Sequence, residues 1–101
     1  MSNTSRTTPC TPVEARTRLE QARAFLEVAE LVAGGEDDLA TPQVAAALAV
    51  LSGIASSDAA CCARIGTRSR GQDHRAAITL LSTVEPGGRD MAKDLRRLLP
   101  I

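Results

Sequence analysis

Three features of this 101-residue sequence predict an all-α domain. The chain has a single aromatic residue, Phe25, and 44% hydrophobic residues rich in alanine and leucine, a composition that favours helices over sheets. Its formal net charge is zero, which together with the hydrophobic content excludes a disordered chain. Apolar residues also recur at helical spacing after two Thr-Pro pairs. We therefore expect a small up-down bundle of four helices, or five, in one domain at 11–101 after a disordered tail at 1–10.

The first helix is predicted from TPVE at 11–14 to the glycine pair at 34–35. Thr11 suits the N-cap, Pro12 the first helical position and Glu14 the acidic position of a capping box. Charged residues line the opposite face in i, i+3 and i, i+4 register. The stripe expected to face the core consists of Leu19, Ala22, Phe25, Leu26, Ala29, Val32 and Ala33.

The second helix repeats the Thr-Pro start at 41–42 and is predicted to reach about Ile65. Residues 44–55 are apolar on nearly every face, as in a central helix that neighbours cover all round. A chain this short can cover such a helix completely only with help, so we expect a homodimer whose interface includes Ala45, Ala49 and Gly53. The alternative is an intramolecular core with an alanine face.

Two further helices are expected, from near Asp73 to the EPGG turn at 85–88, and from about Arg89 to Leu99. The residues expected to face inward are Ile78, Leu81 and Val84 in the third helix, and Met91, Leu95, Leu98 and Leu99 in the fourth. The chain ends on the apolar sequence LLPI, which indicates either an incomplete domain or an end held by packing.

The cysteines and the N-terminus bear on location and metal content. The sequence has three cysteines, Cys10, Cys61 and Cys62, which is not the even number of a disulfide framework, and their spacing does not suit zinc. We therefore expect no metal and no cofactor. Cys61 and Cys62 are expected to be buried thiols. The first twelve residues are polar, unlike a secretory signal. The apolar run at 44–55 is too short to span a bilayer. The expected location is the cytoplasm, without membrane association.

Charge is separated along the chain. Residues 11–40 carry three arginines against seven carboxylates, a formal net charge of −4, whereas residues 64–101 carry eight basic against four acidic residues, a net charge of +4. This separation is consistent with an anionic partner at the basic end, with an acid-to-base fit between subunits, or with a solvated surface.

The segment TRSRGQDHR at 67–75 is the candidate binding site for an anion or a nucleic acid. Arg68, Arg70 and Arg75 flank the start of a helix, where backbone N–H groups and the helix dipole favour phosphate. Asp73, however, is the natural N-cap and would occupy those N–H groups. His74 then becomes a structural or merely exposed residue, because no Ser, Cys or second acid stands at a catalytic spacing from it.

The amphipathic first helix, the alanine-rich segment AAALAVLSGIASSDAACCARIG, the basic loop TRSRGQDHR and the leucine-containing third helix resemble the HEPN superfamily over about residues 12–99. The resemblance implies a helical domain that dimerises and occurs beside nucleotidyltransferases or in toxin–antitoxin and defence systems. Many members cleave RNA with an Arg and a His four to six residues apart, and Arg68 and His74 match that spacing. The family's pair normally lies around the last long helix, whereas the last helix here is short and contains no histidine.

Two functional hypotheses follow. The first is a non-catalytic dimeric HEPN-like helical module that binds a partner protein or RNA in a stress, defence or toxin–antitoxin setting. The second is a metal-independent ribonuclease in which Arg68 stabilises a phosphate and His74 transfers protons. We favour the first, because the position of the Arg-His pair departs from the family pattern.

Overall fold

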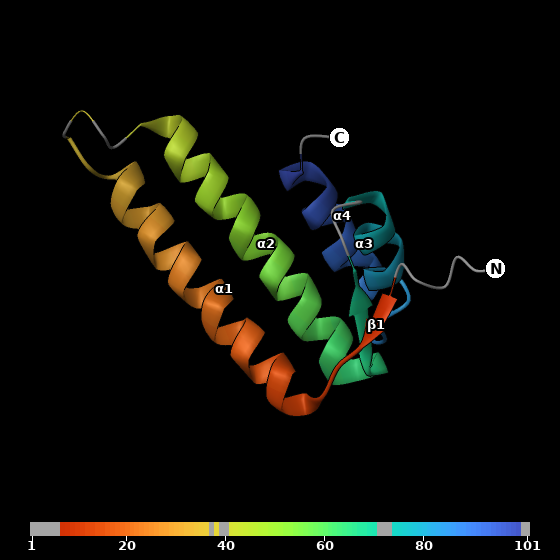
Figure 1. Cartoon of the computed structure of the whole chain (residues 1–101). Coiled ribbons are helices and arrows are strands. Elements are labelled where there is room, and N and C mark those ends of the chain that lie inside the picture. The colour runs from red at the N-terminus through yellow and green to blue at the C-terminus, as the bar shows by residue number, and fades with distance from the viewer. Residues whose placement is uncertain (1–6, 37, 39–40, 71–73, 100–101) are drawn as a thin grey trace.

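The computed structural model of the chain describes residues 7–36, 38, 41–70 and 74–99. These residues form β1 (Thr7–Pro9), α1 (Pro12–Ala33), α2 (Pro42–Ile65), β2 (Thr67–Ser69), α3 (His74–Leu81) and α4 (Gly88–Leu98). α1 and α2 form a long antiparallel hairpin, and the other elements gather beside the C-terminal half of α2 (Figure 1). The prediction of a small all-α bundle is confirmed, with a two-stranded sheet added.

The Thr-Pro pairs at 11–12 and 41–42 each begin a helix, as predicted. The Thr11 hydroxyl accepts the Glu14 N–H at 3.1 Å, and a Glu14 carboxylate oxygen accepts the Thr11 N–H at 3.1 Å, which completes the capping box. The Thr41 hydroxyl accepts the Val44 N–H at 3.3 Å. α2 ends at Gly66, whose φ of 68° is the left-handed conformation that glycine adopts most readily.

Small residues form the seam between α1 and α2. α1 buries Ala15, Ala22 and Ala29, which lie seven residues apart and therefore on one face. The Ser52 hydroxyl of α2 donates to the Ala22 carbonyl oxygen at 2.8 Å, so the two backbones lie close together. Short side chains at the seam permit this approach, because a leucine in their place would hold the helix axes apart.

The predicted inward stripe of α1 is wrong in part for the same reason. Leu19, Leu26 and Ala33 are exposed, and Phe25 and Val32 are half-buried. Leu19 and Leu26 are also seven residues apart, so they share a stripe beside the alanine seam. The larger side chains therefore flank the helix contact.

The main hydrophobic cluster lies where α3 and α4 pack on α2. Its buried members are Cys61, Leu81, Val84, Ala92, Leu95 and Leu99. α3 ends at Leu81, earlier than predicted, and Val84 is buried from the turn that follows. α4 packs through Ala92 and Leu95, and Leu99 packs from the position directly after the helix. Met91 and Leu98, predicted to face inward, are exposed on an adjacent stripe. Ile78 is half-buried against the cluster.

The strand pair ties the N-terminal segment to the body of the fold. β1 and β2 are antiparallel, with Thr7 opposite Ser69, Thr8 opposite Arg68 and Pro9 opposite Thr67. The sequence predicted a disordered tail at 1–10, but residues 7–10 form this strand and its connection to α1. Runs of three residues carry too little periodicity to be recognised as strands. Residues 1–6 of the predicted tail lie outside the described residues.

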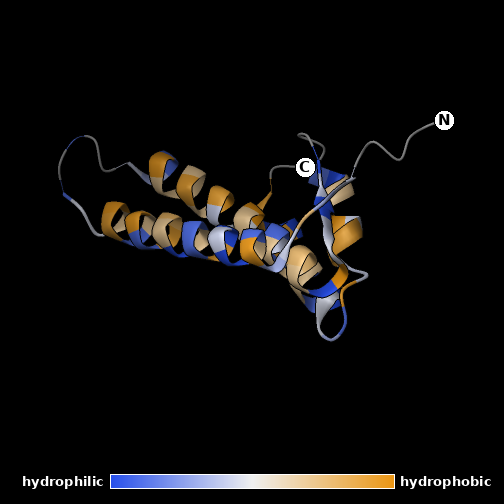
Figure 2. Cartoon of the chain, turned by 60° about the horizontal axis from the view of Figure 1, so that its bottom comes forward, coloured by the Kyte–Doolittle hydropathy of each residue, from blue (hydrophilic) through white to orange (hydrophobic). Residues whose placement is uncertain are grey.

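The end of the hairpin that joins α1 to α2 extends beyond α3 and α4 (Figure 1). Figure 2 shows hydrophobic residues on both of its helices in this region. Every residue of α2 from 44 to 51 is half-buried or exposed, so this chain does not provide the all-round cover that the sequence led us to expect. Among the described residues, α2 is also the helix that is long and apolar enough to cross a membrane, and a third of its most apolar 18-residue window is buried within the fold.

Replacing Gly88 with alanine is expected to destabilise the fold by about 1–3 kcal/mol, because the new Cβ would overlap the packed α3–α4 turn. The Cβ would collide with the Leu81 carbonyl oxygen and lie 3.1 Å from Val84 Cβ. Urea unfolding followed by circular dichroism measures the loss. The matched control is Gly34→Ala, whose Cβ would only meet the Glu30 carbonyl oxygen at 3.6 Å. Equal stability of the two variants would contradict the expectation.

Candidate functional site

An apolar recess lies on α2, between α1 and α4. Small residues of α2 form its floor, among them Gly53, Ser56 and Ala60. Leu19 on α1 and Met91 and Leu98 on α4 line its two walls, and each is between 38% and 41% exposed. Leu26, which is 48% exposed, follows Leu19 by seven residues and continues the α1 wall beyond the recess. We call this recess, with its floor and these four side chains, the α1–α4 groove.

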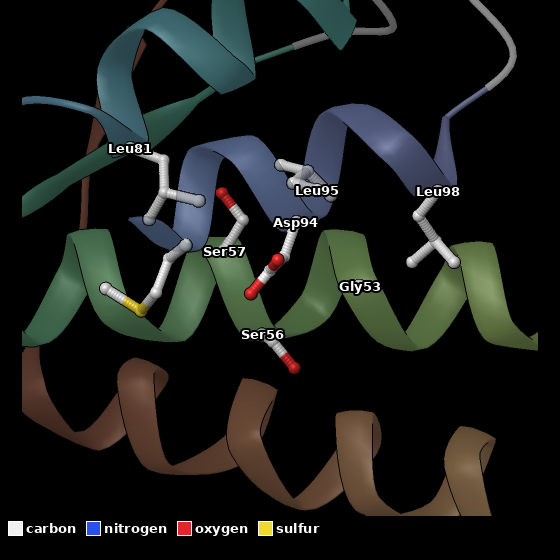
Figure 3. A pocket seen from close by; sticks show the side chains of 8 residues that line it. Gly53, Ser56, Ser57, Leu81, Asp94, Leu95 and Leu98 are labelled. Atoms are coloured by element: carbon white, nitrogen blue, oxygen red, sulfur yellow. The ribbon is translucent and has the colours of Figure 1, made fainter. Parts of the chain in front are cut away.

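Two adjoining cavities make up the groove. One, of about 220 Å³, lies between α2 and α4 and reaches Leu81 of α3, and the other, of about 610 Å³, lies between α1 and α2. Ser56 and Met91 line both cavities, so the two are continuous. Figure 3 shows the first cavity, with Leu98 and Leu81 toward opposite ends and Ser56 directed toward α1.

Gly53 sets the depth of the groove on the α4 side. A Cβ at this position would lie 2.5 Å from Leu98 Cδ2 and 3.3 Å from Leu95 Cδ1. The absence of a side chain therefore lets α4 approach α2 closely. Of the three residues predicted at a dimer interface, Gly53 already packs against α4 within the chain. Ala45 and Ala49 lie on the same stripe of α2, nearer its N-terminus, and are half-buried.

The polar groups that line the groove are few. They are Arg16 on α1, Ser56 and Ser57 on α2, and Asp94 on α4. Asp94 is largely exposed, with Arg97 4.0 Å away, so it stays hydrated. Lining residues of this kind contain no nucleophile paired with a base, and they suit an apolar partner with a polar edge better than they suit catalysis.

The predicted anion site is spread over two elements. Arg68 lies in β2 and is half-buried, Arg70 follows the strand and is exposed, and His74 and Arg75 begin α3, half-buried and exposed respectively. β2 and α3 are in contact, which brings these residues to one end of the molecule. The predicted N-cap, Asp73, lies outside the described residues. Within the described part of the chain, no hydrogen bond or ion pair joins Arg68 to His74.

Sequence reasoning missed a pair of cysteines that joins the end of β1 to α2. Cys10 forms a disulfide with Cys62, with their Cα atoms 5.4 Å apart. The odd number of cysteines and the assignment of Cys10 to a tail argued against this bond, and the expectation that Cys62 is an unmodified thiol is therefore wrong. Cys61 is a buried thiol, as predicted. The described residues contain no group of three or more His, Cys, Asp or Glu side chains placed to hold a metal ion.

Cys61 is expected to resist alkylation in the native protein. Burial raises the pKa of its thiol to about 11, and the nearby Asp58 carboxylate adds to the increase. At pH 8 roughly one molecule in a thousand would carry the reactive thiolate. Iodoacetamide followed by mass spectrometry should modify none of the cysteines of the oxidised native protein and one cysteine after unfolding. Rapid modification of the native chain would contradict this.

No family model matches this chain, and neither a curated protein nor a solved structure matches it.

Proposed function

We propose that this protein is a non-catalytic helical interaction module, in which two copies pair through the α1–α4 groove and the dimer binds a partner protein. The observation that carries the proposal is the groove itself, where four large apolar side chains stand exposed around a floor of small residues. Contiguous apolar surface of this kind on a soluble domain is typical of protein interfaces.

The shape of the groove suits a helix from a second copy. The floor of the groove bears only small side chains, methyl or hydroxymethyl groups, so the axis of a second helix can come near α2. The stripe of α1 that bears Leu19 and Leu26 is exposed, so each copy offers a helix as well as a groove. A two-fold axis would place the same stripe of each copy against the groove of the other, the arrangement of an isologous dimer.

The charge distribution supports a second copy as the occupant. α1 carries four glutamates against three arginines, a formal net charge of −1, and α4 carries four basic against two acidic residues, a net charge of +2. An isologous contact that brings α1 of one copy toward α4 of the other would pair these opposite charges twice. Dimerisation is also what the resemblance to the HEPN superfamily implies.

Light scattering or sedimentation should report twice the chain mass of 10.6 kDa. Leu19→Glu and Ser56→Leu are expected to weaken dimerisation by roughly tenfold or more, because the first places a charge in the apolar contact and the second fills the floor. Both residues are exposed in the single chain, so the fold should persist. The matched controls are Val13→Glu and Leu31→Glu, at 66% and 74% exposed positions of α1 away from the groove. These two should remain dimeric.

A monomer at high protein concentration, or dimers weakened equally by all four variants, would contradict the proposal. The same preparations decide between a protein partner and RNA. Salt-dependent binding of a generic RNA that is lost when Arg68, Arg70 and Arg75 are replaced by glutamine would favour RNA. Metal-independent RNA cleavage that His74→Ala abolishes would replace the proposal by the ribonuclease hypothesis.

A further inference from the structure

The Cys10–Cys62 disulfide connects two parts of the fold that are otherwise weakly joined. Cys10 directly follows β1, and Cys62 lies in the last turns of α2. The bond therefore fastens the N-terminal strand to the helical body. Cys62 is 2% exposed, whereas Cys10 is half-buried at the surface.

Few other interactions hold β1 in place. Three residue pairs join it to β2, the Cys10 N–H donates to the Gly66 carbonyl oxygen at 3.0 Å, and the Thr67 hydroxyl donates to the Thr8 carbonyl oxygen at 3.0 Å. Thr7 and Pro9 are exposed, so the strand buries little apolar surface. An isolated pair of strands this short is marginal in water, which leaves the disulfide as the main attachment.

α1 does not depend on β1 for its start. The capping box of Thr11 and Glu14 satisfies the first N–H groups of the helix within the helix itself. The seam with α2 is made further along by the buried alanines and by the bond from Ser52 to Ala22. Release of β1 would thus leave the contacts of the hairpin unchanged.

We propose that the Cys10–Cys62 disulfide is a site of thiol–disulfide exchange with a dithiol reductant, and that its reduction releases β1 from β2. The proposal does not depend on the dimer. A thiolate of the reductant attacks Cys10 Sγ, the more accessible sulfur, and the electron pair of the S–S bond leaves with Cys62 Sγ, which takes up a proton. The second thiol of the reductant then attacks the reductant's first sulfur in the mixed disulfide. This closes a disulfide within the reductant and releases Cys10 as a thiol. Two electrons and two protons pass from the dithiol to the protein.

Release of β1 would change what the basic end of the molecule presents. β2 would become a free edge, with backbone N–H and C=O groups of residues 67–69 open to another strand. Arg68, which now lies opposite Thr8, would lose the strand beside it. The disulfide therefore controls access to β2 and to the residue that the sequence marked as a candidate phosphate ligand.

Hydrogen exchange with mass spectrometry tests the release, on the oxidised chain and after dithiothreitol treatment, in the cold and without denaturant. Reduction should bring segments 7–10 and 67–69 close to the exchange rates of an unstructured chain. Segments 22–29 and 52–59 of the hairpin should stay strongly protected, with only the faster exchange that follows from the lower global stability. Cys10→Ser should show the fast pattern without reductant. Cys61→Ala, which removes the third thiol and keeps the disulfide, should respond as the natural sequence does.

Three results would overturn the proposal. Unchanged exchange of segments 7–10 and 67–69 after reduction would show that other contacts hold β1. Loss of protection throughout the hairpin, to the level of segments 7–10, would show that reduction opens the whole fold and does not release β1 alone. Glutathione captured on Cys62 rather than Cys10 after brief treatment would place the attack on the wrong sulfur.

Discussion

Replacing Cys10 with serine is expected to lower the free energy of unfolding by about 4 kcal/mol. The disulfide joins residues 52 positions apart, so it restricts most of the hairpin in the unfolded chain. Loss of the bond returns that conformational freedom to the unfolded state, and the loop-closure relation for this separation gives the figure of about 4 kcal/mol. Denaturant unfolding of the oxidised natural sequence and of the variant measures the difference.

The control for this prediction is a second variant, Cys62→Ser, together with the reduced natural sequence. All three lack the same cross-link, so they should lose similar stability, with an additional loss in Cys62→Ser because its hydroxyl replaces a sulfur at a buried position. Under conditions where the folded form still dominates, the helical signal should be retained. A loss below about 1 kcal/mol in all three would mean that the bond is absent from the oxidised protein or that the unfolded chain is already compact.

The helix limits could be predicted because their signals are local. Thr11 and Thr41 each stand before a proline, and a hydroxyl at the N-cap followed by proline at the first turn acts through bonds within four residues. Gly66 ends α2 for an equally local reason, its positive φ. The expected all-α class follows from these limits and the composition.

The side chains at the helix contacts could not be predicted in the same way. Ala22 and Leu26 lie on neighbouring stripes of α1, both with heptad repeats, and the sequence does not show which one faces α2. The choice depends on the distance between the axes, which is short because α2 offers Ser52 and Ala55 at the seam. The choice matters for the candidate site, since leucines excluded from the seam become the wall of the α1–α4 groove.

The disulfide was missed for another reason. Pairing of Cys10 with Cys62 depends on a hairpin that returns the chain to its start and on a strand of three residues, and neither leaves a pattern around the cysteines themselves. The basic residues at 68–75 were predicted to form one site because they are close in the sequence, and the structure divides them between β2 and α3, which lie in contact.

Replacing Arg18 with methionine is expected to cost about 2 kcal/mol of stability, more than the loss from Asp58→Asn. Arg18 of α1 donates to the Asp58 carboxylate of α2 through Nε at 3.2 Å and Nη2 at 2.9 Å. Asp58 is 6% exposed and has little access to water, while the Arg18 side chain is 29% exposed. Removal of the arginine therefore leaves a buried charge without a counterion, whereas removal of the carboxylate leaves a guanidinium that can turn toward water. The partial exposure of Arg18 reduces the figure from the 3–5 kcal/mol typical of fully buried pairs to about 2 kcal/mol.

A double-mutant cycle separates this pairing from the packing of the two side chains. The combination of Arg18→Met with Asp58→Leu removes both charges and retains apolar volume at the seam, so its stability should lie within about 1 kcal/mol of the natural sequence and above that of Arg18→Met alone. Arg97→Met is the matched control, because Arg97 and Asp94 are 4.0 Å apart and both largely exposed, and it should leave the unfolding midpoint unchanged. If the double variant is no more stable than Arg18→Met, the loss comes from the arginine's packing against α2 and not from the unpaired carboxylate.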